Sequence, residues 1–183
     1  MEIVALIVSG LSLAVTIVGT CLSNARSKEA LTESRQAAAD ARWSTLQEAV
    51  QRLIGFDPTA EPISDRLANL RIAMLALVDH LDDWKGLDTW LEAERVLGAT
   101  YGRHVMEGAS ADDTVDQRLD RLNPLMVWAA TLSSNLRYLR STGYKADALS
   151  KLRSHAEDLV EDIHARHGWE LPPKGNPHVE PLI

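Results

Sequence analysis

The chain has few of the residues from which a function is usually read. Its 183 residues include one cysteine and one phenylalanine, and acidic side chains outnumber basic ones, giving a formal net charge of −7. A single cysteine excludes an intrachain disulfide, so no oxidising compartment is indicated. The negative charge argues against a groove for DNA or RNA and against a second contact with anionic lipid. We therefore expect no nucleic-acid partner.

Catalytic motifs are also missing from the sequence. It contains no glycine-rich phosphate-binding loop and no dinucleotide-binding fingerprint. No serine stands in a nucleophile elbow, and the only cysteine, Cys21, lies within an apolar run near the N-terminus. These absences predict a protein that is not an enzyme and that carries no cofactor.

The N-terminus carries an uncharged run of twenty residues from Ile3 to Leu22. A helix rises about 1.5 Å per residue, so this run matches the roughly 30 Å apolar core of a bilayer. A cleaved secretory signal and a lipoprotein signal ending at Cys21 are the alternatives, but the basic start that is typical of such signals is missing. The sequence thus predicts a single-pass transmembrane anchor over residues 1–23.

The charges beside the anchor predict its direction. Lys and Arg near a spanning segment are retained on the cytoplasmic side of the membrane. None precede the run, and four follow it at Arg26, Lys28, Arg35 and Arg42. We expect the N-terminus outside and the bulk of the chain in the cytoplasm, at the inner membrane of a bacterial cell.

Small residues recur inside the anchor at alternating spacings of four and three, which places them on one face of a helix. In lipid, small residues let two helix backbones approach, and hydroxyl groups hydrogen-bond between them. The alternative is that these hydroxyls bond only to their own backbone. We expect the face to mediate self-association or pairing with another spanning helix. Its residues are Ala5, Ser9, Ser12, Thr16, Gly19 and Ser23.

Residues 24–42 are rich in Ala, Glu, Arg and Gln and contain almost no large apolar side chain. This composition has a high helix propensity, but a polar helix without a packed face is marginal alone in water. The segment is expected to be a helical stalk that continues the anchor, or else a frayed linker.

Apolar residues recur at helical spacing through residues 43–168. The clearest pattern starts at Ile63 and keeps a four-three repeat to Trp84, as in a coiled coil packed lengthwise on its neighbours. A third helix is expected from Leu87 to Gly108, antiparallel to the second. The predicted fold is all-α: one transmembrane helix, a helical stalk and a cytoplasmic antiparallel bundle of four to five helices.

The fourth helical region of this bundle has two features that the sequence leaves open. Asp112 or Asp113 can cap its start, and its apolar face begins at Leu119. Pro124 then either kinks the helix or, with Asn123 as a new cap, splits it in two.

A fifth helix is expected from near Leu149 to Gly168, followed by an extended, proline-rich tail over residues 169–183. Trp169 begins this tail, and exposed tryptophans often anchor protein interfaces. Trp169 therefore either packs the tail onto the bundle or contacts a partner, and of the five tryptophans it is the candidate for a partner contact. The other tryptophans lie on or beside apolar stripes and are expected to fill the core: Trp43, Trp84, Trp90 and Trp128.

Only one group of residues suggests a metal site. His164 and His167 are three residues apart on the fifth helix, with Glu161 one turn before His164, and imidazole and carboxylate can both ligate zinc. The favoured interpretation is structural, since a histidine at the end of a helix interacts well with the helix dipole. His164 is then expected on a solvated side, and no metal is expected.

These patterns favour a membrane-anchored adaptor, scaffold or sensor whose bundle binds another protein or a second copy of itself. The alternative is a membrane-tethered effector in host protection or phage exclusion. A third hypothesis, a metal-dependent enzyme, depends on Glu161, His164 and His167.

Overall fold

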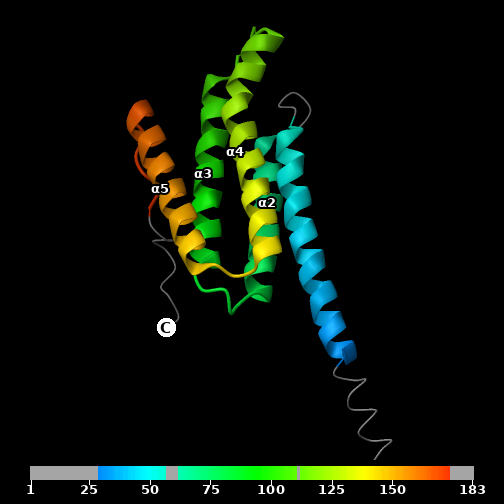
Figure 1. Cartoon of the computed structure of the whole chain (residues 1–183). Helices are drawn as coiled ribbons and strands as arrows, with labels where there is room; N and C mark the ends of the chain where they lie inside the picture. Colours follow the sequence, from blue (N-terminus) through cyan, green and yellow to red (C-terminus); the bar gives the residue numbers. More distant parts are fainter. Residues whose placement is uncertain (1–28, 57–61, 111, 174–183) are drawn as a thin grey trace, which may run out of the picture. The chain divides into compact units, whose positions relative to one another are not determined.

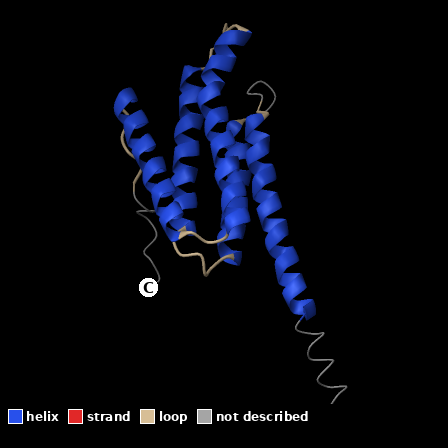
Figure 2. Ribbon diagram, viewed as in Figure 1, coloured by secondary structure: helices blue, strands red, loops and turns tan. Residues whose placement is uncertain are grey.

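The computed structural model describes residues 29–56, 62–110 and 112–173. All regular secondary structure in these ranges is helical (Figure 1, Figure 2), which confirms the predicted all-α fold. A first helix covers residues 29–54. It is followed by α2 (Ile63–His80), α3 (Leu87–Gly108), α4 (Val115–Thr142) and α5 (Ala146–His167).

The predicted anchor over residues 1–23, with its small-residue face from Ala5 to Ser23, lies outside the described residues. The start of the predicted stalk and most of the tail lie outside them too. No helix within the described ranges combines the length and the apolar character that are needed to cross a bilayer.

The chain divides into two compact units between Ala41 and Arg42. The described part of the first unit, residues 29–41, is helical, and almost every side chain in it is exposed. Exposure is expected for these residues because nearly all of them are polar or small. Leu31 is the exception among them, a large apolar side chain that is 53% exposed.

The second unit is a bundle in which successive helices run in opposite directions (Figure 1). Its central element is α3, which packs against α2, α4 and α5. The core is built mainly from leucines, together with the buried rings of Trp43, Trp90 and Trp128. The helical periodicity of the sequence therefore identified the main core elements.

The second helix ends earlier than its apolar repeat predicts. Its stripe is buried at Leu70 and Leu77, but the helix stops at His80, four residues before Trp84. The chain then turns into α3, whose N-cap Gly86 takes a left-handed φ of 89° that glycine adopts without strain. Trp84 is accordingly half-buried in that turn.

An aromatic cluster holds the turn after α2 in place. The Trp84 ring centroid lies 5.8 Å from that of Trp43 in the first helix and 5.9 Å from that of Tyr144, just before α5. The Tyr144 hydroxyl donates a hydrogen bond of 3.1 Å to the carbonyl of Lys85. Three segments far apart in the sequence are thereby joined at one end of the bundle.

The start of α4 differs from the prediction. Its N-cap is Thr114, whose side chain accepts a hydrogen bond from the backbone N–H of Gln117, while the Gln117 side chain accepts one from the Thr114 N–H. Neither Asp112 nor Asp113 caps the helix, because Asp113 instead accepts from the backbone N–H of Ser110 and pairs with Arg121.

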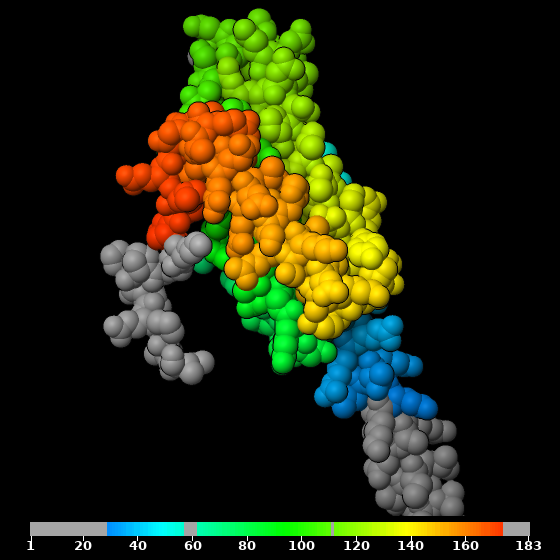
Figure 3. All heavy atoms as spheres, turned by 60° about the vertical axis from the view of Figure 1, so that its left-hand side comes forward, coloured from blue at the N-terminus to red at the C-terminus, as the bar shows by residue number. Residues whose placement is uncertain are grey.

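The rest of α4 is one continuous helix, so Pro124 does not split it and Asn123 is not a cap. Its apolar face is buried from Leu122 onward, but Leu119 is 51% exposed and the prediction was wrong there. The N-terminal turns of α4 extend past the end of α5, which leaves this part of the face uncovered (Figure 1, Figure 3).

Candidate functional site

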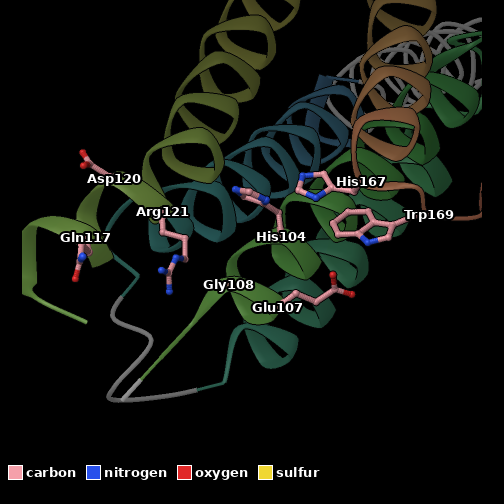
Figure 4. Close-up of a pocket in the computed structure, with 8 residues that line it drawn as sticks. All are labelled: His104, Glu107, Gly108, Gln117, Asp120, Arg121, His167 and Trp169. Atoms are coloured by element: carbon pink, nitrogen blue, oxygen red, sulfur yellow. The ribbon is translucent and has the colours of Figure 1, made fainter. Parts of the chain in front are cut away.

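A groove of about 550 Å³ is lined by the last turns of α3, the first turns of α4 and the end of α5 (Figure 4). We call it the histidine groove. It combines two imidazoles, one indole, one guanidinium and several acidic or amide groups. Its lining residues are His104, Glu107, Gly108, Gln117, Asp120, Arg121, His167 and Trp169.

The end of α5 positions the indole of the groove. Gly168 takes a left-handed φ of 67°, which reverses the chain, and the Trp169 N–H then donates a hydrogen bond of 2.9 Å to the His164 carbonyl. The Trp169 ring stacks on His167 with centroids 4.3 Å apart and an interplanar angle of 16°. The guanidinium of Arg103 lies 4.1 Å from the Trp169 ring centroid.

His104 on α3 and His167 on α5 face each other in the groove with ring centroids 5.1 Å apart. Burial lowers the pKa of His104 below its usual 6.5, and the charges of His167, Arg121 and Arg166 lower it further, against a smaller raising effect of Glu107. The electrostatic potential at His104 is therefore positive, and its imidazole favours the neutral form.

Two ion pairs hold the cations beside these histidines. Arg121 pairs with Asp113, and their side chains are only 25% and 10% exposed. Arg103 pairs with Glu107 at 2.6 Å. Gly108 leaves room for the first pair, because a Cβ there would lie 2.9 Å from Cδ of Arg121. Figure 4 shows Arg121 reaching toward Gly108, while the Asp120 carboxylate points away from the histidines.

The residues proposed as metal ligands do not come together. His164 is buried, at 6% exposure, so the expectation of a solvated side chain was wrong. Its Nδ1 donates to the Glu170 carbonyl at 2.8 Å, and its Nε2 lies 3.2 Å from the Thr100 hydroxyl. Both ring nitrogens are thus engaged, because α5 is rotated so that His164 faces α3.

Of the other two candidates, Glu161 is exposed, and His167 is the last residue of α5 and lines the groove. Across residues 29–56, 62–110 and 112–173, no three potential metal ligands lie close together.

The structure also contains a buried carboxylate that the sequence patterns did not identify. Glu94, in the middle of α3, is 6% exposed. Its Oε1 accepts a hydrogen bond of 3.0 Å from the Trp90 indole, and its Oε2 accepts one of 2.8 Å from the Trp128 indole. Burial raises the pKa of Glu94, and the two indole hydrogen bonds and the more distant charge of His155 oppose this shift only in part.

Trp128 reaches Glu94 because Gly98, one turn after Glu94 on α3, has no side chain. A Cβ at Gly98 would lie 2.4 Å from the Trp128 ring. A sequence signal did exist, since Glu94 stands where the apolar stripe of α3 should place a large apolar residue, with Trp90 four residues earlier on the same face. Its second partner, Trp128, is 34 residues away and cannot be inferred from local spacing.

No protein-family model, curated protein or solved structure matches the chain. The function is therefore inferred from the residues themselves. Glu94 has its hydrogen-bonding partners inside the core, whereas the histidine groove presents aromatic and cationic groups at the surface. Such groups are frequent energetic centres of protein interfaces.

Proposed function

We propose that this protein is a single-pass membrane protein whose helical bundle binds another protein through the histidine groove, as an adaptor, scaffold or sensor. The uncharged run at the N-terminus supports the membrane anchor. The observation that carries the binding proposal is Trp169, which lines the groove with its ring placed between surface and core. Tryptophan and arginine are enriched among the residues that dominate binding energies.

The fixed geometry of Trp169 supports this role. Its backbone N–H is bonded to the His164 carbonyl, its neighbour Glu170 accepts from the His164 ring, and its own ring stacks on His167. A partner that meets a side chain already held in one orientation loses less conformational entropy on binding. Trp169 is therefore suited to act as an anchor for a partner.

Self-association through the membrane helix would strengthen such binding. The proposed helix-association face runs from Ala5 to Ser23 and would bring two copies of the groove to the same partner complex. Two linked binding sites raise the overall affinity through a higher effective concentration, without any new contact. A scaffold or sensor that responds to assembly of its partner would gain from this arrangement.

A site-specific crosslinking experiment tests the proposed function. A photo-crosslinking amino acid replaces Asp120, an exposed residue of the groove, in the full-length protein in native membranes. The control places the same amino acid at Asp147, an exposed residue in the first turn of α5, at the opposite end of that helix.

We expect one partner protein to be crosslinked from Asp120 in near-stoichiometric amount and not from Asp147. Identical adducts from both positions would contradict a role of the groove. No adduct from Asp120, together with a monomeric protein in mild detergent, would contradict the adaptor function as a whole.

A further inference from the structure

We propose that the histidine groove binds a carboxylate group of the partner, presented by an acidic peptide segment, and that the histidine pair takes up a proton when it binds. This proposal rests on the proposed function, since it names the chemistry of the partner at the same site. It assigns the carboxylate to a position between Arg121 and the facing rings of His104 and His167.

The donors of Arg121 support this assignment. A guanidinium has five N–H groups, and Asp113 accepts from one on each terminal nitrogen. The remaining N–H groups can donate to a second carboxylate. Because Asp113 holds the guanidinium in place, a ligand does not have to order that side chain.

The charges around the histidine pair support it as well. On α3, Glu107 is paired with Arg103; on α5, Arg166 is paired with Asp162 at 2.8 Å. The carboxylate of Asp120 on α4 points away from the two rings (Figure 4). These carboxylates are engaged or turned away, so the cations nearest His104 outweigh Glu107. Their charges add to the effect of burial, which is the main cause of its lowered pKa.

The same potential predicts how binding depends on pH. A carboxylate beside the rings would raise the pKa of His104 from its lowered value, because it favours the protonated form. The complex then binds a proton that the free protein does not. The affinity for the carboxylate therefore rises as the pH falls below the pKa of His104 in the complex. It stops rising once the pH is below the lower pKa of His104 in the free protein.

The form of the groove favours a peptide over a small anion or a nucleic acid. Its volume of about 550 Å³ is far larger than one carboxylate, and Trp169 supplies an apolar wall for neighbouring side chains. Glu107 and Asp120 also line the groove and would repel a ligand that carries many negative charges. A ligand with one carboxylate, placed between the cations, meets less of this repulsion.

An NMR titration of the full-length protein in detergent micelles, with labelled histidine side chains, tests the proposal. The probe is a blocked pentapeptide with Glu at its centre and Leu on either side. The matched ligand control replaces Glu by Gln, and inorganic phosphate tests whether any small anion suffices. The protein variants are His104→Gln and, as a matched control, His155→Gln, an exposed histidine on α5 about 18 Å along the helix from His167.

We expect the Glu peptide to shift the His104 and His167 resonances and to raise the His104 pKa. Its binding should tighten several-fold from pH 7.5 to pH 5.5, and His104→Gln should weaken it about tenfold and reduce the pH dependence to that of the remaining His167. The Gln peptide should bind at least tenfold more weakly, and His155→Gln should behave as the wild type.

Equal binding of the Glu and Gln peptides, or a Glu affinity that does not change with pH, would overturn the proposal. Phosphate displacing the Glu peptide at equal concentration would overturn its assignment to a peptide. If the crosslinking from Asp120 succeeds and this titration fails, the adaptor function stands and only the carboxylate chemistry is wrong. Binding of the Glu peptide without any partner crosslinked from Asp120 would overturn the assignment of the carboxylate to a partner protein.

Discussion

Replacing Glu94 with Gln tests the buried carboxylate at the centre of α3. The two carboxylate oxygens accept hydrogen bonds from the Trp90 and Trp128 indoles at 3.0 and 2.8 Å. An amide has a single oxygen, so in the Gln variant one indole N–H faces an NH₂ group and loses its acceptor. A buried donor left unsatisfied costs about 1–3 kcal/mol. Taken alone, this loss predicts a destabilised variant.

The ionisation of Glu94 acts in the opposite direction and depends on pH. Burial raises the pKa of Glu94 in the folded protein above its usual 4.5. As the pH rises through 4.5, the unfolded carboxyl ionises while the folded one keeps its proton, so the wild type loses stability until the pH passes the folded pKa. Gln has no such loss, so the wild-type advantage should be largest at and below pH 4.5 and should narrow as the pH rises toward the folded pKa.

Thermal unfolding of the full-length protein in detergent, followed by near-UV circular dichroism of the tryptophans, measures this difference. The matched control is Glu92→Gln on the same helix. Glu92 is exposed, and its pKa is lowered mainly by the hydrogen bond from Arg95, so its small contribution is present at neutral pH and is lost on acidification. A difference between wild type and Glu94→Gln that stays constant or widens as the pH rises would refute the raised pKa.

Three further substitutions test the packing and the capping of the bundle by the same unfolding measurement. Gly98→Ala should destabilise the protein by about 1–3 kcal/mol, although alanine has a helix propensity about 1 kcal/mol better than glycine, because its Cβ would lie 2.4 Å from the rigid Trp128 ring. Gly102→Ala, whose Cβ would meet only the terminal methyls of Leu67 at 3.0 Å and Ile63 at 3.5 Å, should cost less, and the reverse order would contradict the proposed close packing. Thr114→Ala should cost about 1 kcal/mol through loss of the N-cap, and an unchanged melting temperature would show that the cap contributes nothing.

The helices could be predicted from the sequence because their signals are local. The apolar repeat that starts at Ile63 depends on residues three and four apart, and Gly108, Gly143 and Gly168 stand within one residue of observed helix ends. The N-cap of α4 could not be predicted from spacing alone, because Asp112, Asp113 and Thr114 are all residue types that can cap a helix. Thr114 takes that role since Asp113 is bound elsewhere.

The groove could be predicted only in part. The sequence identifies Trp169 as the first residue of the tail, but its contacts with His167 and Arg103 depend on how α5 docks on α3. The same docking buries His164 against Thr100 and overturned its expected solvated position. Contacts between distant segments follow from the packing of whole helices, and no local spacing encodes them.

The most direct test of the groove as a partner-binding surface compares the wild type with Trp169→Ala in native membranes. Both proteins carry the photo-crosslinking amino acid at Asp120, and the amount of partner adduct per bundle is measured. Loss of a dominant interface side chain costs about 2 kcal/mol or more, which is roughly a thirtyfold loss of affinity. Because the wild-type site is expected to be nearly fully occupied, we predict that the adduct falls several-fold while the melting temperature shows the bundle still folded. An undiminished adduct from a folded Trp169→Ala protein would contradict partner binding at the histidine groove.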